Sequence, residues 1–220
     1  MNLKSLFSQK IRIPKNVVEL TFAEDVALAP EVLKEFGQCR FPYQVSSKFE
    51  KKSDDEKREI ILTAIKYRCV KLLWSLECSV GGYAPADVAK VYLQVMPKEK
   101  TKYTLYNLAV NSDPEKRAVA AEYTEDVDTL TSLAGDSSDK VRNTVRVNKH
   151  ATTEIKKRCE PPLGYVKVSQ GYDPDPIVEQ AVSENKLVKE PFSADWGSAV
   201  YRVNHDKSLS VHSTHYDTSG

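Results

Sequence analysis

The residues of this chain best suited to binding an anion are basic side chains in its third quarter. Arg142, Arg146 and Lys149 follow one another at the spacing i, i+4 and i+7, so a continuous helix would place them on one face. Lys156 and Lys157 extend the basic stretch. Such a face could contact the phosphate backbone of DNA or RNA without reading base sequence. A solvated helix face that binds nothing is the alternative interpretation.

Acidic residues just before this stretch count against a nucleic-acid groove. The five that matter are Glu115, Glu122, Glu125, Asp126 and Asp128. A groove running from about residue 103 to residue 158 would bring phosphate groups against these carboxylates, and like charges repel.

Arg117 and Arg142 each follow a short polar segment that begins with serine, and two roles are open for this pair. Each guanidinium could be structural, pairing with a nearby aspartate or with helix-end carbonyl groups of an adjacent unit. Alternatively, the two could form a ladder that meets phosphate or an acidic partner. The candidate binding surface predicted from the sequence is therefore Arg117, Arg142, Arg146, Lys149, Lys156 and Lys157.

Metal binding and catalysis have weaker support. Three histidines near the C-terminus could supply nitrogen ligands, but their spacing matches no specific motif and terminal residues are usually mobile. These weak candidates are His205, His212 and His215. The four cysteines form no CxxC pair, and the chain lacks a nucleophile elbow, a Walker loop, GxGxxG and HExxH. We expect no cofactor, no metal and no enzymatic activity.

The composition is that of a globular protein. The 220 residues include 32 basic and 31 acidic side chains, so the net charge of +1 points to neither a nucleic acid nor a membrane. No apolar run is long enough to cross a bilayer, and the first residues lack a signal-peptide pattern. With its scattered cysteines, the chain is expected in the reducing cytoplasm, with no membrane partner.

A repeat with a period of about 25 residues organises the middle of the chain. Shifting the sequence by this period aligns two Leu-Ala pairs, a polar corner and the two arginines. The aligned pairs include Thr104 with Thr129, Leu105 with Leu130, Leu108 with Leu133, Ala109 with Ala134, Ser112 with Ser137 and Arg117 with Arg142. Short helices repeated at such a period are typical of a solenoid, in which each unit completes its apolar core by stacking on its neighbours.

The repeat resembles the variant-leucine-rich and HEAT-like α-helical repeats over residues 103–158. The segment "LAGDSSDKVRNTVRVNK" carries the leucine-alanine pair, the aspartate corner, the Val-Arg step and the asparagine turn of such units. The preceding unit has Lys116 where valine is expected. This resemblance implies an α-solenoid. The iron–sulfur cluster of some such proteins is not implied, since clustered cysteines are missing, and the aromatic residues of HEAT-like DNA glycosylases have no residue-by-residue match.

The elements around the repeat are predicted from helical periodicity and capping signals. Ser53 and Glu56 form a capping-box pattern that opens one long helix over 54–79, closed by Gly81 and Gly82. Further helices are predicted at 85–96, 100–110, 114–123, 125–134, 138–147 and 152–159. Residues 1–50 are expected to be irregular apart from a short helix over 29–39, with extended chain or loop over 40–52 because Pro42 restricts Phe41 to extended conformations.

Beyond the paired prolines at 161–162, proline, glycine and aromatic residues dominate. Residues 161–205 are expected to pack on the helical domain of 51–160, with one helix at 175–185 and a short strand at "AVYRV". Residues 206–220 are expected to be a flexible tail.

Together these features predict a mostly α protein built on a short α-solenoid. The predicted function is non-catalytic: an interaction or adaptor protein that presents a curved helical-repeat surface to another protein. The alternative is a DNA- or RNA-binding protein using the basic face of the second repeat, and a second alternative is a DNA-modifying enzyme of HEAT-like type.

Overall fold

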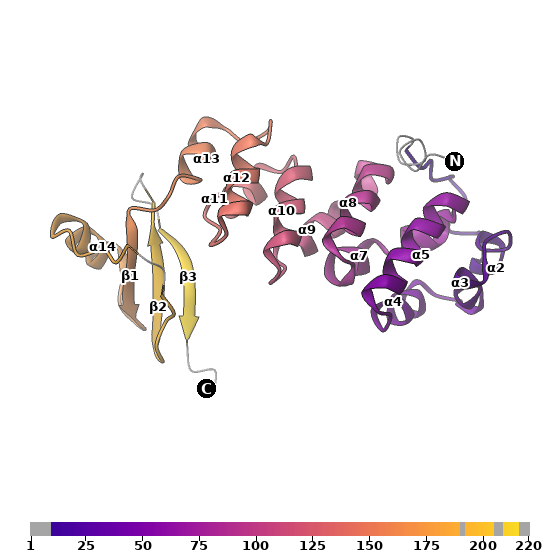
Figure 1. The fold of residues 1–220 in the computed structure, drawn as a ribbon, viewed down its shortest axis with the longest axis horizontal. Helices are drawn as coiled ribbons and strands as arrows, with labels where there is room; N and C mark the ends of the chain where they lie inside the picture. Colours follow the sequence, from indigo (N-terminus) through magenta and orange to yellow (C-terminus); the bar gives the residue numbers. More distant parts are fainter. Residues whose placement is uncertain (1–9, 190–191, 205–208, 216–220) are drawn as a thin grey trace. The chain divides into compact units, whose positions relative to one another are not determined.

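The computed structural model describes residues 10–189, 192–204 and 209–215, which are mostly helical with one small β-sheet (Figure 1). The chain divides into two compact units, Met1–Tyr123 and Thr124–Gly220, which are taken separately below. The boundary lies inside the segment expected to be a single helical domain. None of the described helices is both long and apolar enough to traverse a lipid bilayer.

The N-terminal part of the first unit is more regular than its sequence indicated. Beyond residue 20 it contains four short helices: α2 (Phe22–Asp25), α3 (Glu31–Lys34), the 3-10 helix η1 (Glu35–Gln38) and α4 (Pro42–Glu50). The expected extended chain or loop over 40–52 is thus wrong for residues 42–50. Phe41 is indeed extended before the proline, but Pro42 occupies the first turn of α4, where its missing N–H costs nothing. Buried Phe36 and Phe49 anchor these short helices.

The long helix expected over 54–79 is three helices: α5 (Asp54–Tyr67), α6 (Val70–Ser75) and α7 (Glu77–Tyr83). The Ser53–Glu56 capping box is present as predicted. Arg68 adopts a left-handed conformation with φ 53° and ends α5. The half-buried carboxylate of Asp25 then accepts hydrogen bonds from the backbone N–H groups of Lys71 and Leu72, which starts α6.

Gly81 lies inside α7 instead of closing a helix, because another backbone approaches it. A Cβ atom there would clash with the carbonyl oxygen of Thr104, whereas a Cβ atom on Gly82 would meet nothing within 4 Å. Gly81 therefore permits close packing of α7 against the helix that carries Thr104.

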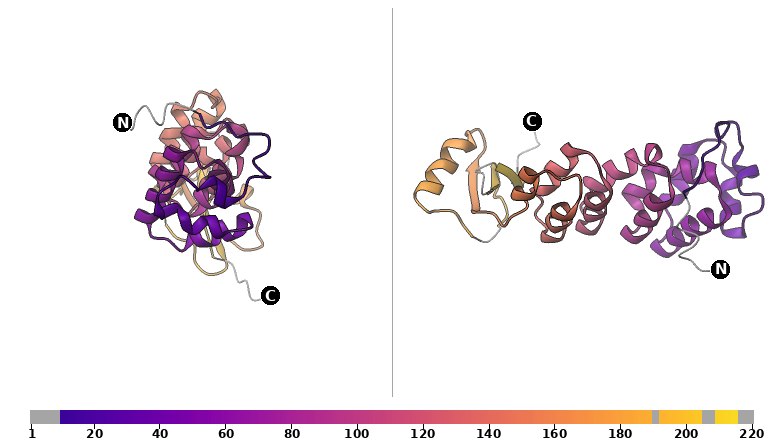
Figure 2. Two further views of the ribbon diagram at one scale, coloured as in Figure 1. Left: turned by 90° about the vertical axis from the view of Figure 1, so that its right-hand side faces the viewer. Right: turned by 90° about the horizontal axis from the view of Figure 1, so that it is seen from above.

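The remaining helices of the first unit lie within one or two residues of their predicted bounds. They are α8 (Ala86–Val95), α9 (Lys102–Ala109) and α10 (Pro114–Tyr123), with the 3-10 turn η2 (Lys98–Lys100) between α8 and α9. α7 packs against both α4 and α9, while α8 packs against both α5 and α10. Figure 2 (right) shows these helices in two layers.

The second unit begins with three helices and ends with a sheet. α11 (Val127–Ala134) packs against α12 (Asp139–Val147) and α13 (Thr153–Arg158), all close to their predicted positions. Strands β1 (Gly164–Ser169), β2 (Ser198–Val203) and β3 (Leu209–His215) form an antiparallel sheet in the order β1-β2-β3, and α14 (Pro174–Ser183) packs on β1.

Two C-terminal predictions have different outcomes. The strand expected at "AVYRV" is confirmed as β2. The flexible tail is wrong for residues 209–215, which pair with β2, while 206–208 and 216–220 lie outside the described residues. The alternation that would have indicated β3 is weak because its side chains are polar and partly exposed, as expected for an edge strand.

Candidate binding surface

The two repeats have the same local structure. α9 and α11 begin one repeat period apart, at Lys102 and Val127, and α10 and α12 begin at Pro114 and Asp139. At the corner between the helices of the first repeat, the side-chain oxygen of residue 111 accepts from the backbone N–H of residue 113 at 3.0 Å. The carboxylate of residue 136 accepts from the N–H of residue 138 at 2.8 Å in the equivalent place. The sequence repeat is therefore a repeat of backbone conformation.

The repeat arginines hold these corners together. Arg117 Nη1 donates to the carbonyl oxygens of residues 111 and 112, at 2.8 and 2.7 Å. Arg142 Nη1 donates to those of residues 136 and 137, at 2.6 and 3.0 Å. Each guanidinium thus closes the corner of its own unit. The structural interpretation expected carbonyl contacts in an adjacent unit, or pairing with an aspartate such as Asp113, Asp136 or Asp139; Arg142 does pair with Asp139, which belongs to its own unit.

Burial removes Arg142 from the predicted binding surface. The residue is only 5% exposed, and its second terminal nitrogen pairs with the carboxylate of Asp139. A ligand would have to displace these internal contacts to reach the guanidinium. Its counterpart Arg117 is half-buried and is committed to the same type of corner.

The other predicted basic residues do not form one helix face. α12 ends at Val147, so Lys149 lies beyond the helix that was expected to align it with Arg146. Arg146 is exposed but donates to the carbonyl oxygen of Cys159 at 3.1 Å. Lys149 and Lys157 are exposed and Lys156 is half-buried. The group is smaller and more dispersed than the sequence indicated.

Arg202 is a buried residue that sequence reasoning missed. It is 1% exposed, and it donates to the carbonyl oxygen of Glu160 at 2.7 Å and to Asn204 Oδ1 at 2.5 Å, with longer contacts of 3.4 Å to the Arg158 carbonyl. Burial, with Arg142 nearby, lowers the pKa of Arg202. Arg146 and Arg202 together satisfy the carbonyl groups at the end of α13, where cations are favoured.

The histidines do not converge on a metal site among the residues described. His205 lies outside the described residues. His212 is the extra residue of a β-bulge in β3, and its ring meets that of Tyr165 edge to face at 5.0 Å between centroids. His215 is exposed at the end of the strand. No group of three histidine, cysteine or acidic residues capable of holding a metal occurs in the described parts of the chain.

An exposed apolar stripe runs along α9 in the first unit. Tyr103, Tyr106 and Val110 are 60%, 65% and 65% exposed and lie at the spacing i, i+3 and i+7. Thr104 and Leu108, on the opposite side of the helix, are buried. We call these three exposed residues the α9 stripe. Two tyrosines and a valine so exposed on one face make a contiguous surface of the kind that protein interfaces favour.

The helices of the other layer present a charged surface instead. Arg58 on α5 lies 2.8 Å from Asp55 and 3.2 Å from Asp87 of α8. Lys90 of α8 lies 2.7 Å from Glu122 of α10. Because these charges pair with one another across α5, α8 and α10, this surface is typical of one that faces solvent.

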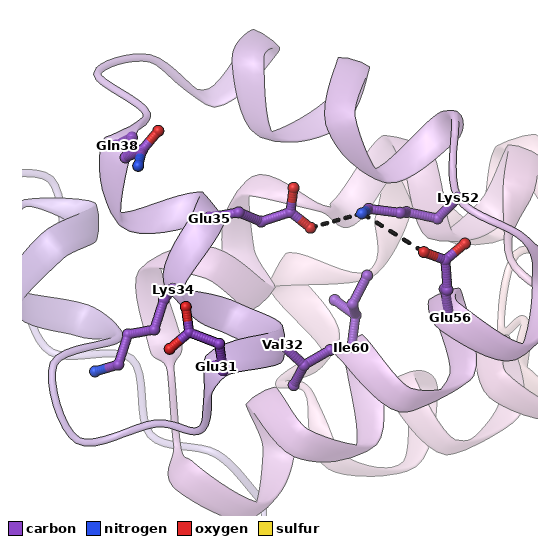
Figure 3. Close-up of a pocket in the computed structure, with 8 residues that line it drawn as sticks. All are labelled: Glu31, Val32, Lys34, Glu35, Gln38, Lys52, Glu56 and Ile60. Carbon is purple, nitrogen blue, oxygen red and sulfur yellow. Dashed lines mark ion pairs between the residues drawn. The ribbon is translucent and has the colours of Figure 1, made fainter.

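A hollow of about 340 Å³ lies between α3, η1 and the start of α5 (Figure 3). Lys52 reaches both the Glu35 carboxylate, at 2.8 Å, and the Glu56 carboxylate, at 3.6 Å. The ammonium of Lys34 points away from this pair and donates to the backbone carbonyls of residues 26 and 27. Since both of its lysines are engaged by groups of the protein itself, we interpret this hollow as a structural junction between helices.

A larger hollow of about 670 Å³ lies at the N-terminal end of the described chain. We call it the N-terminal hollow; its lining consists of residues 10–15, 17–18, 97 and 99–100 together with Trp74. The Lys100 ammonium lies over the Trp74 ring, 4.8 Å from its centroid. The hollow therefore combines apolar surface with several cationic side chains.

Glu77 connects this region with α9. Its carboxylate accepts a hydrogen bond from the backbone N–H of Tyr103 at 3.2 Å, at the N-terminus of α9. Burial raises the pKa of Glu77, while this hydrogen bond and nearby Lys100 oppose the rise. The carboxylate thus fixes the first turn of α9, where the α9 stripe begins.

Comparison with known proteins gives no assignment of this fold. No protein-family model matches the chain, and comparison with curated proteins and with solved structures gives no match. The resemblance to HEAT-like repeats therefore stays a prediction from the sequence.

Proposed function

We propose that this protein is a non-catalytic protein-binding module, and that the α9 stripe is its principal contact surface. The observation that supports the proposal most directly is the exposure of Tyr103, Tyr106 and Val110 on one face of a well-anchored helix. Tyrosine is enriched at the energetic centres of protein interfaces because it offers a large apolar body with a polar tip. Among the described residues of α5, α8 and α10, charged side chains pair with one another, and the exposed ring of Tyr67 on α5 is less exposed than either tyrosine of the α9 stripe.

We further propose that the helices form a short α-solenoid. Support comes from the order of packing in the first unit, where α7 lies between α4 and α9, and α8 contacts α5 and α10. Side chains join α7 to α9 and the corner that follows it: Asn107 donates to the carbonyl of Cys78 at 3.0 Å, and Asn111 to that of Gly82 at 3.2 Å. In such an array a layer can present a rigid helix face without needing to be stable alone.

Nucleic-acid binding through the second repeat is the weaker alternative. Arg142 is buried, Arg146 is engaged with a backbone carbonyl, and Glu154 lies one helical turn from Lys157. These features leave few cations for phosphate groups. No described feature adds support to the DNA-modifying alternative.

The test compares capture of a partner by matched variants of the full chain. Tyr103→Ala with Tyr106→Ala removes both rings from the α9 stripe, and Tyr67→Ala removes an exposed ring from α5. We expect one protein from a lysate of the source cells to be retained by the wild type and the Tyr67 variant, and to be lost with the double variant. Circular dichroism should show all three folded.

Salt separates the two macromolecular classes. A protein contact through the α9 stripe should persist at about 0.3 M salt, since apolar burial is not screened. The proposal would be overturned if the Tyr103 and Tyr106 double variant retained the partner protein as well as the Tyr67 variant does. So would a gel shift of DNA or RNA that falls steeply with salt and is abolished by Arg146→Glu with Lys149→Glu.

A further inference from the structure

The N-terminal hollow has walls fixed by main-chain contacts. The backbone N–H of Ile11 donates to the carbonyl of Val95 at 2.7 Å, and Ile11 is buried. Lys10 Nζ donates to the carbonyl of Met96 at 2.9 Å, and Lys71 Nζ to that of Val18 at 2.9 Å. Both ends of the segment 10–18 are thus attached to the helical core, so the hollow is preformed. Its volume of about 670 Å³ is within the range of sites that accept ligands.

The rim of the hollow carries uncompensated positive charge. Arg12 and Lys15 are exposed, and neither side chain makes an ion pair or hydrogen bond with any residue that the structure describes. Lys100 adds a third cation over Trp74. Glu99 is the single acidic residue in the lining. A ligand with several negative charges would therefore be attracted to the hollow and oriented by its rim.

Part of the lining of the hollow is apolar. Ile13, Pro14, Val18, Trp74 and Pro97 contribute to its lining, and Val18 is 67% exposed. Apolar surface beside a cationic rim suits a chain in which apolar and acidic side chains are mixed. It suits inorganic phosphate poorly, because phosphate has no apolar part to cover Val18 or Trp74.

We propose that the N-terminal hollow binds an acidic, extended stretch of the partner polypeptide, with an apolar side chain of that stretch placed beside Trp74. This inference rests on the proposed function, because the hollow and the α9 stripe adjoin. Lys100 contacts Trp74 and shortly precedes Tyr103 in the chain, while Glu77 hydrogen-bonds the Tyr103 backbone. One polypeptide can therefore occupy the hollow and continue along the stripe.

A single-stranded nucleic acid is disfavoured as the occupant because base stacking needs an open aromatic face, and Lys100 already covers a face of the Trp74 ring. A peptide can direct its apolar side chain to the apolar part of the lining and its carboxylates to Arg12 and Lys15, away from Glu99.

The test measures binding of a synthetic probe to the full-length protein. The probe is a fluorescein-labelled peptide of glutamates interspersed with leucines, and its counterpart carries lysines in place of the glutamates. Fluorescence anisotropy should show saturable binding of the acidic peptide and none of the basic one. In a Trp196→Phe background, Trp74 is the sole tryptophan, and its emission should change on binding.

Charge reversal provides the matched control. Arg12→Glu with Lys15→Glu should weaken binding of the acidic peptide by about tenfold or more, as expected for two lost charge pairs. Arg40→Glu with Lys66→Glu makes the same change in net charge at exposed sites outside the lining, and should leave binding within about twofold. Equal effects of the two double variants would overturn the inference, as would preferential binding of a fluorescein-labelled oligothymidine.

Partner capture distinguishes failure of this inference from failure of the proposed function. If the Tyr103 and Tyr106 substitutions abolish capture while reversal at Arg12 and Lys15 leaves it unchanged, the hollow is not part of the interface and the proposed function stands. If the tyrosine substitutions leave capture unchanged, the proposed function fails whatever the peptide does.

Discussion

Arg202→Met should destabilise the second unit strongly, although Arg202 belongs to a sheet of only three strands. The substitution keeps much of the apolar stem but removes the donors that satisfy the Glu160 carbonyl at 2.7 Å and Asn204 Oδ1 at 2.5 Å. Asn204 is 1% exposed, so water has little access to the oxygen that is left. Loss of the donor to this buried acceptor costs roughly 1–3 kcal/mol, whereas the carbonyl of Glu160, an exposed residue, can be hydrated and costs less.

A favourable term partly offsets this loss. Burial and the proximity of Arg142 lower the pKa of Arg202, which means that its charge is held against an unfavourable environment. Methionine removes that charge. We therefore expect a net decrease of roughly 1–3 kcal/mol in the free energy of unfolding, most of it from the contact with the buried side chain of Asn204.

The tryptophans allow each unit to be followed separately. Trp74 lies in the first unit and Trp196 in the second, and the chain contains no others. Urea unfolding followed by Trp196 emission in a Trp74→Phe background should show a lower midpoint for Arg202→Met. Trp74 emission in a Trp196→Phe background should be unchanged.

Arg146→Met is the matched control, because Arg146 caps the same helix end from an exposed position with one hydrogen bond at 3.1 Å. Its loss should be about 1 kcal/mol or less. If Arg202→Met were neutral or stabilising, or cost no more than Arg146→Met, the buried guanidinium would not be needed to satisfy α13, and the reasoning would be refuted.

Three further outcomes are expected from single substitutions. Gly81→Ala should lower the free energy of unfolding of the first unit by about 1–3 kcal/mol, because its Cβ would clash with the Thr104 carbonyl. Gly82→Ala should be tolerated, since its Cβ would meet nothing within 4 Å. Similar urea midpoints for the two variants would contradict the close approach of α7 and α9. Burial, with Arg202 nearby, lowers the pKa of His212 below its ordinary value of 6.5, so at low pH the unfolded chain binds a proton more readily than the folded state does. The free energy of unfolding of the second unit should therefore fall as the pH drops below about 6.5. The substitution His212→Phe should flatten this part of the pH profile. Asp126→Ala should cost about 1 kcal/mol by removing the side chain that caps α11 at the Thr129 N–H, and Asp126→Asn should restore most of the loss in thermal melts.

Local signals predicted the helices of the repeat region well, because each has its own start and stop residues. Asp126 and Thr152 cap α11 and α13, and the proline at 114 begins α10, so the bounds hardly depend on distant contacts. The long helix over 54–79 failed for the opposite reason. Its break is set by a left-handed Arg68 and by Asp25, which is remote from it in the sequence.

The candidate site was only partly predictable. Helical spacing identified the basic residues of the second repeat but not their burial, which depends on the corner carbonyls and on a strand from the end of the chain. Arg202 gave no signal, since an arginine within "AVYRV" reads as the polar face of a strand. The i, i+3 spacing of Tyr103 and Tyr106 indicates that both rings lie on one face of a helix. It shows that this face is exposed only once Thr104 and Leu108 are known to face the core.

Comparison of the two repeats separates residues that maintain the fold from residues that are available for binding. The repeats share internal features: the corner oxygen, the arginine that closes the corner and a buried leucine, Leu108 in the first repeat and Leu133 in the second. The α9 stripe is not shared, because Tyr103, Tyr106 and Val110 correspond to Asp128, Thr131 and Gly135 in the next repeat. A residue that every unit needs for its own structure has its side chain engaged within that unit. A residue that differs between units remains available to contact a partner. A binding surface in this chain is therefore to be sought where the repeats differ.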